Sequence, residues 1–121
     1  MDVQPPTILV VEDQPLLLIH VQFAFEDAGY RVVQASSADE ALVALDRHPE
    51  IRVIFTDVTM PGTLDGAALA TRVSETHPHV AVLVTSGDQS YVPDNLPAGV
   101  RFVPKPYSGH MIVRMISEEV A

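Results

Sequence analysis

The stretch Thr7-Ile-Leu-Val-Val-Glu-Asp13 runs through aliphatic residues up to Val11 and then ends in two adjacent carboxylates. Four more short runs rich in Val, Ile and Leu follow it, at residues 31–34, 51–56, 81–85 and 100–103. Strands that are apolar nearly throughout, instead of alternating with polar residues, are typical of a parallel sheet covered on both faces. The chain is therefore predicted to be an α/β protein with five parallel strands.

The segments between these runs have the spacing and the end signals of helices. Pro15 lies where the first turn of a helix accepts proline. Ser37 and Glu40 have the spacing of a capping box, and Asp65 can cap another helix. A final helix is expected over residues 108–120. Each strand but one is thus followed by a clear helical segment.

Strands and helices that alternate through right-handed crossovers favour a doubly wound sheet with the flavodoxin-like strand order 2-1-3-4-5. This (βα)5 arrangement places the run at 100–103 at an edge of the sheet. An edge suits Pro104, because proline has no N–H to donate to a ladder. Pro93 and Pro97 leave space for about one helical turn before that run, so the fourth helix is expected to be short or irregular.

The composition limits the classes of function. The 121 residues suit one domain, with residues 1–6 as a disordered lead and residues 7–121 as the folded part. Seven Lys and Arg against sixteen Asp and Glu give a net charge of −9, which argues against binding nucleic acid. The absence of cysteine excludes disulfides and thiol chemistry. No run suits a membrane span or a signal peptide, so a cytoplasmic protein is expected.

Polar residues gather at the expected carboxyl ends of the strands. The first strand ends in Glu12 and Asp13, and the third ends in Asp57. Thr85 ends the fourth strand, and Lys105 follows the fifth. In an open parallel sheet, ligands bind beyond these ends, next to the switch in strand order. Three carboxylates, a hydroxyl and an ammonium are therefore predicted to converge there.

This set of side chains suits a metal-bridged anion. Three neighbouring carboxylates repel one another unless a cation lies among them. Oxygen ligands without Cys or His favour a hard ion, Mg²⁺ or Mn²⁺. Lys105, the only lysine in the chain, supplies a point charge for a phosphate oxygen, and Thr85 supplies a hydroxyl. Asp57 is the candidate nucleophile, and its product would be an aspartyl phosphate.

Four segments, each at the end of a predicted strand, carry a family resemblance. They are Val-Glu12-Asp13, Thr-Asp57-Val-Thr-Met-Pro61, Val-Thr85-Ser-Gly and Lys105-Pro106. In this order and spacing the chain resembles the receiver domain of bacterial two-component response regulators, from Ile8 to about Val120.

The resemblance implies a role for each acidic residue. Asp57 corresponds to the phosphoacceptor. Asp13 and Asp57, with the backbone carbonyl of Thr59, correspond to the direct Mg²⁺ ligands. Glu12 would act through a metal-bound water.

The resemblance also implies a switch. Thr85 and Lys105 would bind phosphoryl oxygens, and the Lys105–Pro106 peptide bond would be cis. Phe102 fills the position of the switch aromatic, whose ring turns inward as the threonine moves toward the phosphate.

The predicted function is a phosphorylation-dependent switch of the single-domain type in a two-component phosphorelay. A histidine kinase or a histidine phosphotransfer protein would donate a phosphoryl group to Asp57, with Mg²⁺ required. The phosphorylated domain would present an altered surface to an unknown downstream protein, as a monomer or a phosphorylation-dependent dimer. It would promote its own phosphotransfer and dephosphorylation without being a turnover enzyme.

Three alternatives stay open. The chain could be the receiver portion of a hybrid histidine kinase or of a larger regulator. It could be a metal-dependent phosphohydrolase with Asp57 as nucleophile, although Thr59 offers no second acid two residues later. It could also be a binding module that never accepts phosphate.

Overall fold

The computed structural model describes residues 5–58, 65–86 and 96–120, in which strands and helices alternate along the chain. The strands are β1 (Thr7–Val11), β2 (Arg31–Ala35), β3 (Ile51–Asp57), β4 (Ala81–Ser86) and β5 (Arg101–Pro104). The helices are α1 (Pro15–Asp27), α2 (Ala38–Arg47), α3 (Gly66–Thr76) and α4 (Gly109–Val120). Of the segment expected to hold a short or irregular fourth helix, residues 87–95 lie outside the described ranges and residues 96–99 are not helical. Residues 1–4 of the predicted lead also lie outside the described ranges.

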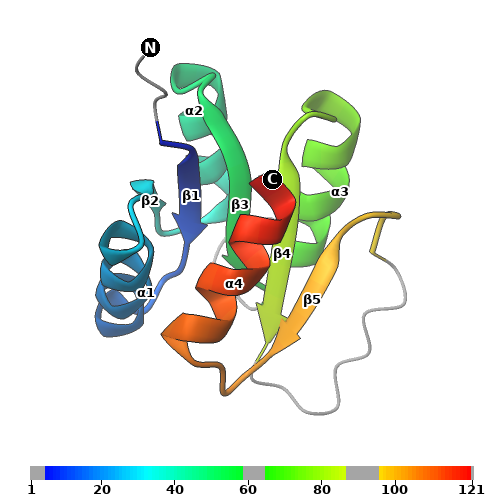
Figure 1. The fold of residues 1–121 in the computed structure, drawn as a ribbon. Helices are drawn as coiled ribbons and strands as arrows, with labels where there is room; N and C mark the ends of the chain where they lie inside the picture. The colour runs from blue at the N-terminus through cyan, green and yellow to red at the C-terminus, as the bar shows by residue number, and fades with distance from the viewer. Residues whose placement is uncertain (1–4, 59–64, 87–95, 121) are drawn as a thin grey trace.

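The five strands of the described residues form one parallel sheet (Figure 1) in the order β2-β1-β3-β4-β5. This order confirms the predicted doubly wound, flavodoxin-like topology. β5 lies at an edge, next to β4. There the Lys105 N–H donates to the Ser86 carbonyl at 3.0 Å, so the missing N–H of Pro104 leaves the ladder to β4 intact.

The sheet is the middle layer of three. Helices α1 and α4 lie on one face and α2 and α3 on the other (Figure 1). On the first face, Val21 and Phe25 of α1 pack with Ile112 and Ile116 of α4. Because both faces are covered, the central strands β1, β3 and β4 are almost entirely buried, which explains their continuous aliphatic sequence, whereas the edge strands β2 and β5 are only partly buried.

Capping side chains begin two of the helices. The Ser37 hydroxyl accepts a hydrogen bond from the Glu40 N–H at 3.1 Å, and Asp65 Oδ1 accepts from the Ala68 N–H at 2.8 Å. The reciprocal half of the predicted capping box is displaced by one residue, since the Glu40 carboxylate accepts from the N–H of Ser36 and not of Ser37. These bonds satisfy N–H groups that the first helical turn leaves without partners.

Pro6, within the predicted lead, is bonded to the start of β2. Its carbonyl accepts a hydrogen bond from the Arg31 N–H at 3.1 Å. None of the helices in the described ranges has the length and hydropathy needed to cross a bilayer.

Candidate functional site

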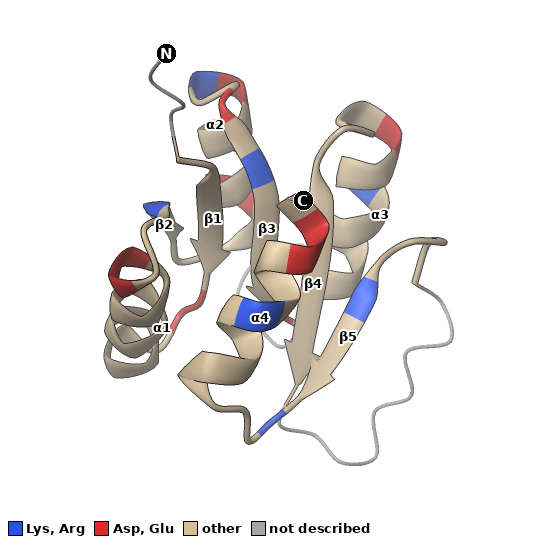
Figure 2. Ribbon diagram, in the orientation of Figure 1, with Lys and Arg blue, Asp and Glu red and all other residues tan. Residues whose placement is uncertain are grey.

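The carboxyl ends of the strands bring distant residues together. In Figure 2, the acidic segment after β1 and the basic segment after β5 lie at the same end of the sheet. Asp57 is the register partner of Thr85 across β3 and β4. Val11 is the partner of Thr56 across β1 and β3, so the next residue along β1, Glu12, comes level with Asp57. Pairing of the strands therefore assembles the site from four segments of the chain, at the ends of β1, β3, β4 and β5.

Lys105 neutralises part of the acidic cluster. Its Nζ donates to Asp57 Oδ2 at 2.5 Å and lies 4.0 Å from Glu12 Oε1. The Lys105 side chain is 21% exposed, and the Asp57 side chain is buried. A charge-assisted hydrogen bond with little access to water is stronger than one at the surface. The ammonium therefore holds the Asp57 carboxylate in place.

Glu12 is a buried acid with unmet bonding capacity. It is 4% exposed, and its backbone N–H donates to the Ala35 carbonyl at 3.0 Å. Neither carboxyl oxygen finds a hydrogen-bond partner among the described residues. Burial first, and repulsion from Asp57 second, raise the pKa of Glu12 from 4.5 to about 7, and the charge of Lys105 opposes this shift. The site thus disfavours a further negative charge unless a cation is bound there.

Thr85 supplies a second unpartnered group. Thr85 is buried, and its hydroxyl oxygen has no hydrogen-bond partner within the described part of the chain. Its backbone carbonyl accepts from the Val58 N–H at 2.8 Å, which ties the end of β4 to the residue after Asp57. Buried polar groups normally have partners. Three oxygens without a hydrogen bond from the described residues, two of Glu12 and one of Thr85, therefore indicate a place for a polar ligand.

The sequence profile of the response regulator receiver domain matches residues 8–117. The chain belongs to this family. Receiver domains are phosphoacceptor switches of two-component signalling and generally bind Mg²⁺ for phosphorylation, and they are not classical enzymes. The geometry above, with an aspartate held by a lysine beside unpartnered oxygens, agrees with such a switch.

Relatives of this receiver occur inside larger proteins. It is 33% identical over 119 residues to the sensor kinase CckA of Brucella abortus, covering 93% of the chain and 12% of the kinase. It is 32% identical over 113 residues to the nitrogen assimilation regulatory protein NtrX of Azorhizobium caulinodans, covering 88% of the chain and 24% of NtrX. The chain thus spans no more than about a quarter of either protein.

A solved structure agrees with the fold of this receiver. The crystal structure of a response regulator receiver domain protein from Clostridium thermocellum matches it with a TM-score of 0.84 at 28% identity. The match covers 94% of this chain and 93% of that one. The flavodoxin-like receiver fold is therefore shared along nearly the whole length of both chains.

The donor chemistry of the site fits a hard divalent cation, but the acids do not form a closed cage. Glu12 offers two buried oxygens without partners, and Asp57 lies level with it. Asp13 is exposed, and no three Asp, Glu or His side chains of the described ranges are gathered closely enough to hold a metal ion. Thr59, the fourth predicted ligand, lies outside these ranges. The described residues thus supply the ligand types for Mg²⁺ without a finished arrangement.

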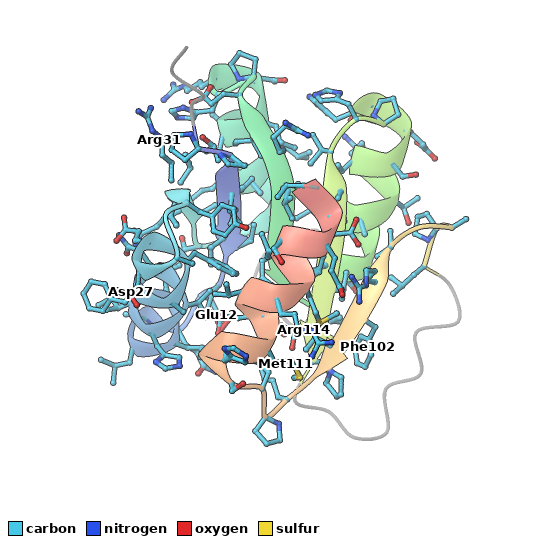
Figure 3. All side chains as sticks on the ribbon, viewed as in Figure 1. Glu12, Asp27, Arg31, Phe102, Met111 and Arg114 are labelled. Carbon is cyan, nitrogen blue, oxygen red and sulfur yellow. The ribbon has the colours of Figure 1, made fainter. Side chains whose placement is uncertain are left out.

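The remaining predicted residues lie on or just after β5. Phe102 is half-buried and packs against the core on the α2 and α3 face of the sheet (Figure 3). The Lys105–Pro106 peptide bond is cis. Phe102 and Lys105 are therefore carried by one short segment at the edge of the sheet.

Two residues near the site were missed in the sequence. The Tyr107 ring stands edge-on to Phe55, with ring centroids 5.5 Å apart. Burial first, and then the negative charges of Glu12 and Asp57, raise the pKa of Tyr107 well above its ordinary value. Gly66, to which the sequence analysis gave no role in the site, contacts the Asp57 backbone directly. The available signal was the Asp65-Gly66 pair at the end of the segment 60–66.

Proposed function

We propose that this receiver accepts a phosphoryl group on Asp57 from a phosphohistidine of a histidine kinase or a histidine phosphotransfer protein. The observation that supports this most strongly is the 2.5 Å contact between Lys105 Nζ and Asp57 Oδ2, beside the unpartnered oxygens of Glu12 and Thr85. A carboxylate held by one ammonium next to unused polar groups is prepared for an incoming anion.

The transfer itself needs positioning and charge neutralisation. One carboxylate oxygen of Asp57 forms a bond to phosphorus while the bond from phosphorus to the imidazole nitrogen breaks, and the histidine ring, which takes up one proton from water, leaves as neutral imidazole. Lys105 shifts its hydrogen bond from Asp57 to a phosphoryl oxygen. The Thr85 hydroxyl donates to another phosphoryl oxygen and thereby gains the partner that it lacks.

Mg²⁺ would be held by Asp13, Asp57 and the backbone carbonyl of Thr59, with Glu12 acting through a bound water. When bound, the ion neutralises the carboxylates and the charge of the transferred group. Glu12 contributes by placing two oxygens without partners in a buried position, where the gain from a nearby cation is large. The same ion and residues would support hydrolysis of the acyl phosphate. The domain would therefore promote both its own phosphorylation and its own dephosphorylation, without sustained turnover.

The signal would be passed on by a rearrangement of Thr85 and Phe102 after phosphorylation. The phosphoryl group adds negative charge beside Lys105 and Thr85. As Thr85 moves toward it, the half-buried ring of Phe102 turns inward and changes the surface at β5. An unknown downstream protein, or a second copy of the domain, would bind to this altered surface.

Helix α1 offers a surface for the phosphoryl donor. Leu16, Ile19 and Phe23 share one side of α1, and Leu16 and Phe23 are 85% and 64% exposed. Large exposed apolar side chains in a row mark interaction sites. Because α1 begins only a few residues after Asp13, a helical donor bound there would bring its histidine toward Asp57.

The proposal is tested by intact-mass analysis after incubation with acetyl phosphate and Mg²⁺. The wild type is expected to gain one phosphoryl adduct, and Asp57→Asn is expected to gain none. Labelling that survives Asp57→Asn would show that another residue is the acceptor. Continued turnover of a phosphomonoester would instead support the metal-dependent phosphohydrolase.

A second candidate is the receiver portion of a hybrid histidine kinase. The match to the sensor kinase CckA, of which this chain spans 12%, favours it. In that case a kinase core within the same polypeptide would be the donor. Phosphotransfer profiling against isolated kinase cores would separate the two, since a single-domain switch should accept phosphoryl rapidly from a kinase encoded as a separate chain.

A further inference from the structure

We propose that Gly66, together with Thr56, is a positioning residue for the phosphoacceptor: the bare backbone of Gly66 lets helix α3 lie directly against the Asp57 carbonyl. This inference rests on the proposed function, because it assigns the purpose of the contact to the acceptor role of Asp57. It concerns the backbone beneath the carboxylate and not the ligands of the phosphate.

The contact leaves no space for a side chain at position 66. A Cβ there would lie 2.1 Å from the Asp57 carbonyl oxygen and 2.8 Å from both the Asp57 carbonyl carbon and the Val58 Cα. These are backbone atoms and not the flexible end of a side chain, so a methyl group would force α3 and the end of β3 apart. Gly66 does not have a positive φ. Its glycine is therefore required for close approach and not for backbone conformation.

Three hydrogen bonds hold the backbone of Asp57 and Val58 in place. The Thr56 hydroxyl donates to the Asp57 carbonyl at 3.0 Å. The Gly66 N–H donates to the Val58 carbonyl at 2.9 Å, and the Val58 N–H donates to the Thr85 carbonyl at 2.8 Å. The backbone carbonyls of Asp57 and Val58 and the N–H between them are thus bonded from β3, from α3 and from β4. The bond from the Val58 N–H also connects the acceptor to the backbone of Thr85.

This arrangement sets the position of the carboxylate. The Asp57 side chain is short, so a shift of its backbone carries over to Oδ2 and to the 2.5 Å contact with Lys105. Misplacement of a reacting group by about 1 Å costs on the order of 100-fold in rate. Packed interiors transmit such shifts because they contain few voids. The depth at which α3 lies on β3 therefore controls the reactivity of Asp57.

The test compares Gly66→Ala with Gly109→Ala. Gly109 is the first residue of α4, as Gly66 is of α3, but a Cβ at Gly109 would meet only the Ala24 Cβ, at 3.1 Å. With acetyl phosphate and saturating Mg²⁺, Gly66→Ala is expected to be phosphorylated at least about tenfold more slowly than wild type, and Gly109→Ala within about twofold of it. In the metal-free proteins, NMR should show shifts of the Val58 amide proton and the Thr85 carbonyl carbon in Gly66→Ala only.

A second variant covers the case in which Gly66→Ala does not fold. Thr56→Val keeps the shape of the buried side chain but removes the hydroxyl that donates to the Asp57 carbonyl. It is expected to show the same slower phosphorylation and a shift of the Val58 amide proton, because the Asp57 carbonyl loses its hydrogen bond from the Thr56 hydroxyl. A purely structural role would lower the unfolding temperature without moving these signals in the folded protein.

The outcomes separate the inference from the function on which it rests. Wild-type rates together with an unmoved Val58 amide in Gly66→Ala or, if that variant does not fold, in Thr56→Val would overturn the positioning role and leave Asp57 as acceptor. A wild-type protein that never labels at Asp57 would overturn both.

Discussion

Glu12 and Asp13 are adjacent acids with opposite surroundings. Glu12 is buried, whereas Asp13 is exposed. Both follow the end of β1 at Val11, Glu12 in the interior of the site and Asp13 at its solvent-exposed rim. Burial and the charge of Asp57 then raise the pKa of Glu12 to about 7. The protonation of Glu12 is thus governed by its burial and by the neighbouring Asp57.

The raised pKa predicts a pH-dependent cost in stability. Folding disfavours the ionised form of Glu12, so the folded protein holds a proton that the unfolded chain releases between pH 4.5 and 7. The contribution of Glu12 is fully favourable below pH 4.5 and is lost as the pH rises through about 7. Glu12→Gln does not titrate. Relative to wild type, its free energy of unfolding without divalent metal should rise by up to about 3 kcal/mol from pH 4.5 to 8.

Urea unfolding at these two pH values measures the difference. Glu40→Gln is a suitable control, since Glu40 is an acid whose hydrogen bonds to Ser36 lower its pKa instead of raising it. The control should show no such rise. Parallel pH profiles for Glu12→Gln and wild type would contradict the buried position of this carboxyl group.

At the scale of elements, helix α3 differs from α2 in what it touches. Both begin at a capping side chain, Ser37 for α2 and Asp65 for α3. The first residue of α3 also donates to the Val58 carbonyl and lies against Asp57. The start of α3 therefore belongs to the site, whereas the start of α2 belongs only to the fold.

Removing each cap should separate these roles. Asp65→Ala and Ser37→Ala are both expected to lower the free energy of unfolding by about 1 kcal/mol, because each leaves a helical N–H without its acceptor. Only Asp65→Ala should also slow phosphorylation by acetyl phosphate, since it destabilises the first turn of α3, which lies against Asp57. Urea unfolding and a phosphorylation time course measure the two effects. Equal phosphorylation rates in both variants would show that the start of α3 does not control the acceptor.

At the scale of the whole molecule, the site joins segments from most of the chain. Lys105 and Asp57 are 48 residues apart in sequence, and both oxygens of Glu12 stay without partners among the described residues. A ligand that binds only the folded arrangement stabilises the entire domain by mass action. The acidic cluster therefore connects cation binding to global stability.

Magnesium should accordingly raise the unfolding temperature. Mg²⁺ at about 100 times its dissociation constant would add about 2.7 kcal/mol to the free energy of unfolding of the wild type. Asp57→Asn removes one of the proposed ligands and should show a clearly smaller shift. Differential scanning calorimetry with and without Mg²⁺ measures both, and K⁺ at equal ionic strength controls for screening. Equal shifts in the two proteins would place the ion elsewhere.

Local patterns were enough for most of the architecture. Aliphatic runs, the capping residues Ser37 and Asp65 and the edge proline at position 104 each act over a few residues, and together they led to the observed strand order. The strand-end positions of Asp57, Thr85 and Lys105 followed from that order. Their convergence was predictable because parallel strands all end at the same edge of the sheet.

The sequence by itself determined the class of the fold, the strand order and the residue types that meet at one end of the sheet. Only the tertiary structure decided that Glu12 is buried and Asp13 exposed, that the Tyr107 ring packs edge-on against Phe55 and that Gly66 lies against the Asp57 carbonyl. The physical reason is that periodicity and capping are properties of neighbouring residues. Burial, pKa and close approach instead depend on how far apart the packed helices and strands lie, to within a few tenths of an ångström.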